Sequence, residues 1–271
     1  MTSQAQRILA PEEREFYCQT LSIFEQKRID VLVGGAYAFA RYTGIERHTK
    51  DLDIFVRPAD FKKTLSALEQ AGYAVDIPYP HWLGKAYCGE YFVDVIHSSG
   101  NGVAVVDEEW FANAPRDAIF DLPVSLCPKE EMIWSKSFIQ ERERFDGADV
   151  AHLILASSSS LDWQRLLRRF GSNWRVLLAH LVLFGFIYPS ERDRVPRWVL
   201  HELTRRLHLE LGAAPPNERA CNGTLLSRQQ YLVDVERWGY RDARTLPDNA
   251  MSDSDIATWT AAIAEDGSKE S

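Results

Sequence analysis

The sequence has little of several features, and each scarcity excludes a class of protein. Its longest apolar run, residues 176–188, contains thirteen residues, whereas a helix that spans a membrane needs about twenty. We therefore expect this run to form a helix of the core, and we expect no association with a membrane. The first sixteen residues also lack the basic start and the apolar stretch of a secretory signal, which favours a cytoplasmic protein.

Cysteine is scarce as well, and a positive net charge is absent. The four cysteines are too widely spaced to form a C-x-x-C pair (Cys18, Cys88, Cys127 and Cys221). This spacing predicts reduced thiols rather than a zinc site or a disulfide framework. The net charge of -8 excludes a surface coated with basic groups for bulk binding of nucleic acid, although a local basic groove is compatible with it.

The pattern of the chain changes near residue 126. Before this point the segments alternate between two patterns, with helices predicted at 11–28, 36–43 and 58–73 and strands at 30–35, 51–56, 74–79, 86–91 and 92–98. Beyond it, helical patterns dominate, at 128–157, 161–187, 196–211 and 227–240, before a tail at 265–271 that is expected to be disordered. The sequence predicts an α/β (α+β) mixed-sheet domain at 1–126, a helical domain at 127–215 and a C-terminal extension at 216–271.

Two carboxylates interrupt the apolar strand predicted at 51–56. Alternate residues of a strand face the same way, so Asp51 and Asp53 are expected to project together while Leu52 faces the opposite side. Carboxylates a few ångströms apart repel each other unless a cation or a proton lies between them. Magnesium takes oxygen ligands and shares them with phosphate, so the pair is a candidate metal site. A solvated edge strand is the alternative.

A third carboxylate and a pair of glycines accompany this strand. Asp94 lies in the apolar segment 92–98, and three carboxylates can hold two metal ions, one activating a hydroxyl and one bound to a triphosphate. An aspartate that caps a turn is the alternative for Asp94. Gly34 and Gly35 end a predicted strand just before a helix, where free backbone amides and the helix dipole favour phosphate. That helix can return the chain beside the first strand.

The segment GGAYAFARYTGIERHTKDLDIFV, residues 34–56, resembles the signature of the polymerase-β-like nucleotidyltransferase superfamily. That signature is a Gly-Gly or Gly-Ser turn, a helix and a D-x-D strand, with a third carboxylate on a later strand. The form Arg-x-Thr-x-Asp-x-Asp is closest to the lincosamide-type antibiotic nucleotidyltransferases and to the nucleotidyltransferase toxins of abortive-infection systems.

The resemblance implies a nucleotidyltransferase fold and a role for each matching residue. Gly34 and Gly35 would bind the triphosphate, and Arg47 and Thr49 would belong to the nucleotide site. The metal, magnesium or manganese, would be bound by the three carboxylates Asp51, Asp53 and Asp94. Asp94 would also help to activate the acceptor hydroxyl.

A second segment, residues 130–153, resembles a helical motif of the toxin branch, in which a lysine is followed by an arginine-rich turn and Asp-x-x-Asp. By position these residues are Lys136, Asp146 and Asp149. Lys136 would contact phosphate or nucleotide, and the two aspartates would support the site. The toxin pattern has arginine and tyrosine where this chain has Phe145 and Ala148, so the toxin–antitoxin assignment matches less well than the fold does. A solvated lysine and a helix-capping aspartate are the alternatives.

The expected function is the magnesium-dependent transfer of NMP from an NTP, such as ATP, to a hydroxyl acceptor on RNA, a protein or a small molecule. The alternative is an inactive nucleotidyltransferase fold kept as a nucleotide-binding or regulatory module. A haloacid-dehalogenase-type phosphatase fits less well, because it needs an apolar strand before the first aspartate, where this chain has RHTK. Metal-dependent glycosyltransferases also fit less well, because their D-x-D follows a longer nucleotide-binding unit without a Gly-Gly turn.

The helical part is locally basic. Between Leu161 and Leu209 there are four acidic residues and nine arginines. The arginines are Arg165, Arg168, Arg169, Arg175, Arg192, Arg194, Arg197, Arg205 and Arg206. This surplus predicts either a groove for RNA, such as tRNA, or an ordinary solvated helix face. The helical spacing of Trp163, Trp174 and Trp198 predicts core positions. The R-x4-H spacing that ends at His180 lies in the apolar run and predicts a core-facing histidine rather than a nuclease motif.

Overall fold

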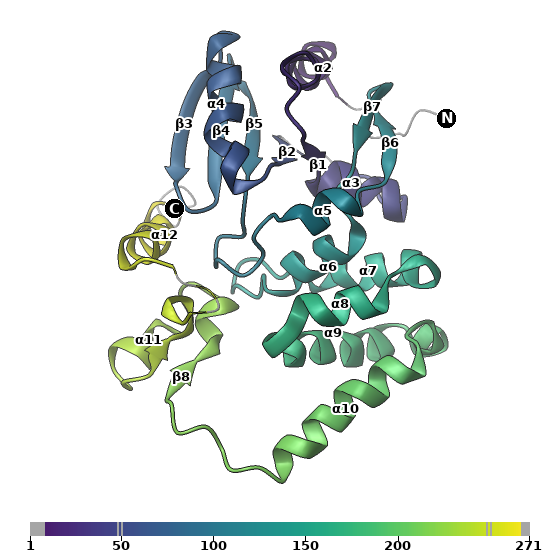
Figure 1. Ribbon diagram of the computed structural model, residues 1–271, viewed down its shortest axis with the longest axis vertical. Helices are drawn as coiled ribbons and strands as arrows, with labels where there is room; N and C mark the ends of the chain where they lie inside the picture. Colours follow the sequence, from purple (N-terminus) through teal and green to yellow (C-terminus); the bar gives the residue numbers. More distant parts are fainter. Residues whose placement is uncertain (1–8, 48, 50, 248, 250, 267–271) are drawn as a thin grey trace. The chain divides into compact units, whose positions relative to one another are not determined.

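The computed structural model describes residues 9–47, 49, 51–247, 249 and 251–266, and it describes side chains as far as residue 261. The chain divides into two compact units, Met1–Pro128 and Lys129–Ser271. The predicted boundaries at 126 and 215 stay predictions. Figure 1 shows the elements of each unit.

The first unit contains a five-stranded mixed sheet in the order β1-β2-β5-β4-β3 (Figure 1). The strands are β1 Leu32–Val33, β2 Asp51–Phe55, β3 Ala74–Tyr79, β4 Leu83–Cys88 and β5 Tyr91–Ile96. Strands β2 and β5 are parallel, and all other neighbours in this sheet are antiparallel. A mixed sheet accompanied by helices confirms the predicted α+β class. The helix between β1 and β2 returns the chain beside β1, as expected.

Among its described residues, the first unit also contains helices and a hairpin: α2 Pro11–Lys27, α3 Gly35–Thr43, α4 Phe61–Gln70, α5 Glu108–Ala112, and the paired strands β6 Arg116–Ile119 and β7 Leu122–Ser125. Helix α3 ends where Gly44 takes a φ of 72°, a left-handed conformation that glycine adopts without strain. Helix α4 follows a 3-10 turn at Pro58–Asp60.

Helix α4 covers one face of the sheet. A Cβ atom at Gly84 of β4 would lie 2.8 Å from Leu65 and 3.0 Å from Phe61, both on α4, so glycine allows the helix to approach closely. Leu52 and Val93 are fully buried and share this face with Gly84 through the strand register. Because successive side chains point to opposite faces, the polar residues of β2, β4 and β5 project from the other side of the sheet.

The second unit is helical. Its helices are α6 Lys129–Ser137, α7 Gly147–Ser157, α8 Trp163–Phe170, α9 Trp174–Ile187, α10 Arg197–Leu211, α11 Leu232–Glu236 and α12 Asp253–Asp266. Two short parallel strands, β8 Ala220–Cys221 and β9 Arg241–Asp242, pair near the C-terminal end.

Two predicted helices of this unit are each divided in the structure. The helix predicted at 128–157 is interrupted between Ser137 and Gly147, where the amide of Glu141 bonds to the carbonyl of Arg144 in a tight turn. The side chain of Glu141 bonds to Ser227, far along the chain, so a tertiary contact outweighs helical propensity there. The helix predicted at 161–187 is broken by a 3-10 turn at Gly171–Asn173, where Gly171 has a φ of 45°.

The C-terminal predictions also need correction. Only Leu232–Glu236 of the predicted helix 227–240 is helical. Helix α12 was not predicted, and it includes residues 265 and 266, which were expected to be disordered. The rest of that predicted tail, 267–271, lies outside the described residues.

The apolar run behaves as a core helix on one side only. Helix α9 buries Leu177, His180 and Phe184, but Phe186 is 80% exposed. Residues Trp163–Ile187 are long and apolar enough to cross a membrane by length and composition, which for a single helical stretch is weak evidence. The histidine is core-facing as predicted, and its ring nitrogen Nε2 lies 3.0 Å from the carbonyl oxygen of Ser137.

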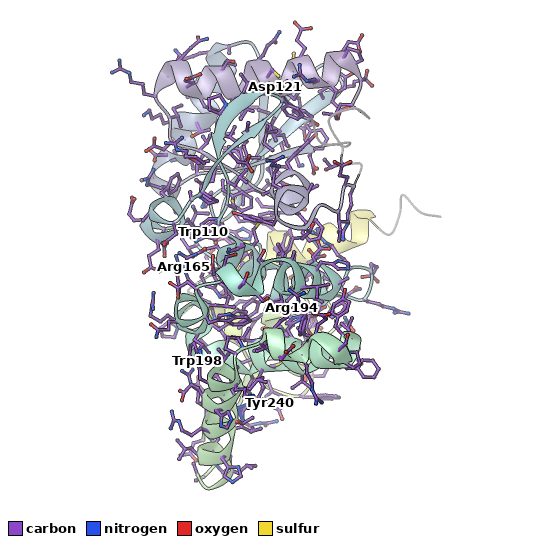
Figure 2. All side chains as sticks on the ribbon, turned by 90° about the vertical axis from the view of Figure 1, so that its right-hand side faces the viewer. Trp110, Asp121, Arg165, Arg194, Trp198 and Tyr240 are labelled. Carbon is purple, nitrogen blue, oxygen red and sulfur yellow. The ribbon has the colours of Figure 1, made fainter. Side chains whose placement is uncertain are left out.

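The three tryptophans differ in burial. Trp163 and Trp174 are buried as predicted, but Trp198 is 47% exposed, so its predicted core position is wrong. Figure 2 labels the side chain of Trp198. Helix α10 buries Val199 and Leu203, which are four residues apart and form its inward stripe. Trp198 lies one position away from this stripe.

Candidate metal centre

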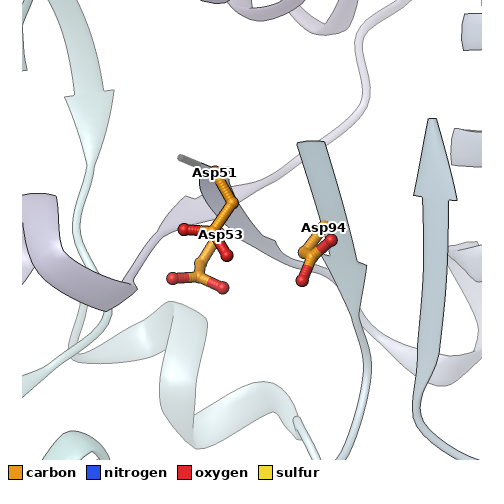
Figure 3. A group of neighbouring side chains, drawn as sticks. All are labelled: Asp51, Asp53 and Asp94. Carbon is orange, nitrogen blue, oxygen red and sulfur yellow. The ribbon is translucent and has the colours of Figure 1, made fainter. Parts of the chain in front are cut away.

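Three carboxylates converge on the face of the sheet opposite α4. The parallel register places Asp53 of β2 directly beside Asp94 of β5, and Asp51 lies two residues earlier on the same face of β2. One oxygen atom from each carboxylate lies within 4.8 Å of the others. Figure 3 shows the three side chains next to one another on their two strands. The alternation expected from the sequence therefore occurs, with Leu52 fully buried on the opposite face.

The electrostatics of this cluster favour a cation. Asp94 is only 8% exposed. Its burial raises the pKa of the Asp94 carboxyl above the ordinary value; the Lys85 ammonium opposes this shift, and the charge of Asp51 adds to it. A cation near these oxygens would offset both the desolvation and the mutual repulsion.

The turn before α3 is built around one of these carboxylates. Gly35 has a φ of 52°, and a Cβ atom at this position would lie 1.6 Å from Oδ2 of Asp53. The amide of Gly34 donates a hydrogen bond of 2.9 Å to the carbonyl oxygen of Asp53. The site thus offers oxygen donors only, close together and held by a glycine cradle, and this donor set fits a hard divalent cation such as magnesium.

Helix α3 begins beside this carboxylate. Its first internal hydrogen bond runs from the amide of Ala38 to the carbonyl oxygen of Gly34, so the amides of residues 35–37 have no acceptor within the helix. The N-cap residue, Gly34, has no side chain that could cap this end. Such an end attracts anions. The amide of Gly34 bonds to the carbonyl oxygen of Asp53, so the expectation of a free amide is wrong for Gly34, and for Gly35 it stays a prediction.

Thr49 and Arg47 lie just before β2. The hydroxyl of Thr49 donates a hydrogen bond to Oδ1 of Asp51. The guanidinium of Arg47 lies 4.7 Å from the centre of the Phe39 ring on α3. In the structure Thr49 therefore orients a carboxylate of the cluster, while the predicted roles of Thr49 and Arg47 in nucleotide binding stay predictions.

Replacing Thr49 tests whether this hydrogen bond supports a metal ligand. We expect Thr49→Val to weaken Mn²⁺ binding by about tenfold, because loss of an outer hydrogen-bond partner typically costs 10- to 100-fold in metal affinity. Thr49→Ser keeps the hydroxyl and should bind like the wild type. Isothermal titration of the purified protein with Mn²⁺ measures both, and equal affinities for the valine and serine variants would contradict the assignment.

The second predicted cluster assembles within the second unit. Nζ of Lys136 lies 2.9 Å from Oδ2 of Asp146 and 2.8 Å from Oδ2 of Asp149. Burial opposes ionisation of Asp146, but hydrogen bonds from Arg144 and Lys136 outweigh it and lower the pKa of this carboxyl. The Lys136 side chain is 16% exposed, so the alternative of a solvated lysine is wrong. Its predicted contact with nucleotide stays a prediction.

The basic helical region does not present its arginines as a free surface. Six of the nine form ion pairs with glutamates (Arg165, Arg169, Arg175, Arg194, Arg205 and Arg206). Arg165 is buried and Arg169 is half-buried, each paired with a glutamate of α6. Arginines already paired with carboxylates offer less charge to phosphates, so the structure does not support the predicted RNA groove.

Sequence reasoning missed two residues beside the carboxylates. Lys85 of β4 bonds to Asp94, and only the register of the hairpin reveals this, because the strand was predicted to begin at residue 86. Tyr37 of α3 has a buried hydroxyl with no hydrogen-bond partner among the described residues. Burial, together with the charges of Glu13, Asp51 and Asp53, raises the pKa of Tyr37. In the sequence, the position of Tyr37 two residues after Gly35 is the feature that could have placed it near the site.

Several solved nucleotidyltransferase structures show a distant likeness to the chain, although no family model and no curated protein match its sequence. The solution structure of the antibiotic-resistance factor ANT(2'')-Ia is 17% identical, with a TM-score of 0.45 over 64% of this chain and 98% of that chain. The lincomycin-bound lincosamide antibiotic adenylyltransferase LnuA is 19% identical, with a TM-score of 0.38 over 53% of this chain and 96% of that chain.

A nucleotidyltransferase-like protein from Paracoccidioides brasiliensis is 15% identical, with a TM-score of 0.36 over 64% of this chain and 93% of that chain. TM-scores below 0.5 are too low for these likenesses to carry an argument about activity.

Proposed function

We propose that this protein is a magnesium-dependent nucleotidyltransferase, which transfers NMP from an NTP to a hydroxyl acceptor. One observation carries the proposal: Asp51, Asp53 and Asp94 converge beside Gly35, at the N-terminus of α3, where the N-cap residue Gly34 has no side chain to cap the helix. A bound triphosphate needs divalent cations and backbone N–H donors at the same place. The three carboxylates offer ligands for the cations, and the first amides of α3 offer the donors. The resemblance of residues 34–56 to the nucleotidyltransferase signature supports the same reaction.

Each group has a defined task in this reaction. Asp51, Asp53 and Asp94 would hold the magnesium, which supplies neutralisation of phosphate charge and lowers the pKa of the acceptor hydroxyl. The amides that open α3 bind phosphate oxygens and fix the triphosphate. The acceptor oxygen forms a bond to the α-phosphorus, the bond to the leaving pyrophosphate breaks, and the acceptor proton passes to the oxygen of Asp94 that Lys85 does not hold. Catalysis is then mainly positioning and charge neutralisation.

The acceptor class is best sought among small molecules first. The paired arginines of the helical unit argue against a broad RNA surface. ANT(2'')-Ia was solved with adenylyl-2''-tobramycin and LnuA with lincomycin, so aminoglycosides and lincosamides are natural first compounds for a panel. The structure forms no disulfide between Cys18, Cys88, Cys127 and Cys221, which fits a reducing compartment such as the cytoplasm.

A labelling experiment tests the proposal. The purified protein is incubated with each α-labelled NTP and Mg²⁺ or Mn²⁺, in the presence of aminoglycosides, lincosamides, total RNA or a protein extract. We expect one acceptor class to gain label, with release of pyrophosphate, and we expect EDTA to abolish the transfer. Binding of NTP without label in any arm would instead favour a nucleotide-binding or regulatory module. Transfer that survives complete removal of divalent ions would overturn the metal role.

A further inference from the structure

Helix α9 is apolar on two sides. Leu177, Leu181 and Phe184 form the side that is buried within the second unit. The large apolar side chains turned away from it are each at least 42% exposed: Val182, Leu183, Phe186 and Ile187. A surface helix of a globular protein typically has one apolar stripe, and a helix that is apolar all round is normally covered on every side. The outward face of α9 is therefore the kind of surface that a partner covers.

This outward face carries no net charge. Apart from the buried His180, Arg175 is the only ionisable residue in the sequence of α9, and its guanidinium pairs with Glu210 of α10. Two acidic residues and two arginines follow in the turn Pro189–Arg194, so the charges balance there as well. Helices that bind an anionic lipid surface instead carry clustered lysine and arginine on their polar side. The face of α9 matches a partner that is itself apolar and uncharged.

The spacing along the centre of the face is that of two helices packed side by side. The steps are four, three and four residues, from Arg175 through Ala179 and Val182 to Phe186. Apolar positions that alternate in steps of three and four stay on one side of a helix and form the contact line of a helix pair. One partner helix can therefore cover the whole length of this face.

A second copy of α9 complements the face in size and in charge. About a two-fold axis, two antiparallel copies repeat each contact twice. With the axis between positions 182 and 183, the large Phe186 lies opposite the small Ala179 of the partner subunit, and large side chains facing small ones interdigitate. In the same register Arg175 lies opposite Ser190 of the partner subunit, so no like charges meet along the contact line. The antiparallel direction is also the one that the helix dipoles favour.

We propose that the outward face of α9 is an interface between two copies of this chain, which pack their α9 helices antiparallel about a two-fold axis between positions 182 and 183. The inference does not depend on the proposed reaction, because it uses no residue of the carboxylate cluster. An interface centred on one helix from each copy is small. The dimer should therefore have a modest affinity, with a Kd of about 1–10 μM.

Sedimentation equilibrium of the full-length protein tests the interface. The mass should rise with concentration from that of the 31.0 kDa chain towards twice that value. Phe186→Glu should raise the Kd of the dimer at least about a hundredfold, because it places an unpaired charge in the apolar contact of each copy. Phe186 is exposed in the single chain, so circular dichroism and the melting temperature of the dilute variant should match the wild type. If this variant fails to fold, Phe186→Ser carries the test, with the Kd raised about tenfold.

A charge pair tests the register. When Ala179→Lys is combined with Phe186→Glu, each new lysine faces a new glutamate of the partner subunit, and dimerisation should recover at least about tenfold relative to Phe186→Glu alone. Within one chain the two positions are seven residues apart, or about 10 Å along the helix, so the new charges cannot pair there. Ile77→Glu is the matched control. It places the same charge at an exposed apolar position on β3, in the first unit, and should dimerise like the wild type.

Each other outcome overturns the inference. A wild type that remains a monomer up to ~100 μM has no such interface. A dimer that Phe186→Glu leaves intact uses another surface, and a dimer that the added lysine does not restore packs in another register. Flotation with phosphatidylcholine vesicles that contain about one third phosphatidylserine covers the remaining alternative. We expect no flotation, and a monomeric wild type that floats, together with a Phe186→Glu variant that does not, would assign the face to lipid instead.

Discussion

Asp53→Asn is expected to abolish NMP transfer, with kcat/KM lowered at least about a thousandfold, because the site loses several kcal/mol of charge stabilisation. Asp53 lies directly beside Asp94 in the sheet register and against the Gly35 turn, so it faces both the metal ligands and the start of α3. Asparagine keeps the shape of the side chain but not its negative charge. The original carboxylate is also repelled by its neighbours, so this variant should unfold at about the same temperature as the wild type or slightly higher.

Two measurements test this prediction. Transfer is followed by release of pyrophosphate, and folding by thermal denaturation. Asp53→Ala should behave in the same way with respect to transfer. Asp30→Asn removes a carboxylate from an exposed position before β1 and should leave transfer within about twofold, as surface substitutions away from a site usually do. An Asp53 variant that transfers NMP at the wild-type rate would contradict the proposed metal-dependent mechanism.

Gly35→Ala is expected to damage both the site and the fold. The new Cβ atom would lie 1.6 Å from Oδ2 of Asp53 and 3.0 Å from its Cβ, so the carboxylate or the turn must move. The residue would also keep a φ of 52°, which disfavours side chains other than hydrogen. We expect transfer to fall by about a hundredfold, since misplacement by an ångström costs that much, and the free energy of unfolding to fall by about 1–3 kcal/mol.

A second glycine provides the matched control. Gly44 at the end of α3 has a φ of 72°, but apart from its chain neighbours no atom of the described residues lies within 4 Å of the position of an added Cβ. Gly44→Ala therefore imposes the backbone strain without the collision, and it should lose about 1 kcal/mol of stability while retaining transfer. If the two alanine variants transfer NMP equally well, the close approach of Gly35 to Asp53 has no role in the reaction.

The carboxylate cluster was largely accessible from the sequence. A strand has a period of two, and this alone predicts that Asp51 and Asp53 share a face. The paired glycines predict a turn into a helix. Asp94 could be suspected as a charged residue within an apolar strand. Its neighbour Asp53 could not be identified, because that depends on the register of the parallel pair β2 and β5, which are distant in sequence. Lys85 was missed for the same reason, since its importance comes entirely from the residue that it faces.

The helical unit was less predictable, because tertiary contacts decide where its helices end. Nothing local to residues 138–146 forbids a helix, yet the segment turns so that Lys136 meets Asp146 and Asp149. Glu141 bonds to Ser227, a residue 86 positions later. The helical spacing of apolar residues in 128–157 does not predict either contact. Position on the buried stripe of α10, rather than residue type, likewise decides that Trp198 is exposed.

The parallel pairing of β2 and β5 has a consequence for folding. Asp53 and Asp94 belong to strands that are separated along the chain by α4 and by the strands β3 and β4, so the unfolded chain contains no metal site. An ion that binds only the folded state shifts the folding equilibrium by mass action. The same ion relieves the repulsion that the closed sheet imposes on its carboxylates. The divalent ion would then act as a folding ligand, and the stability of the first unit would follow the concentration of the cation that its chemistry requires.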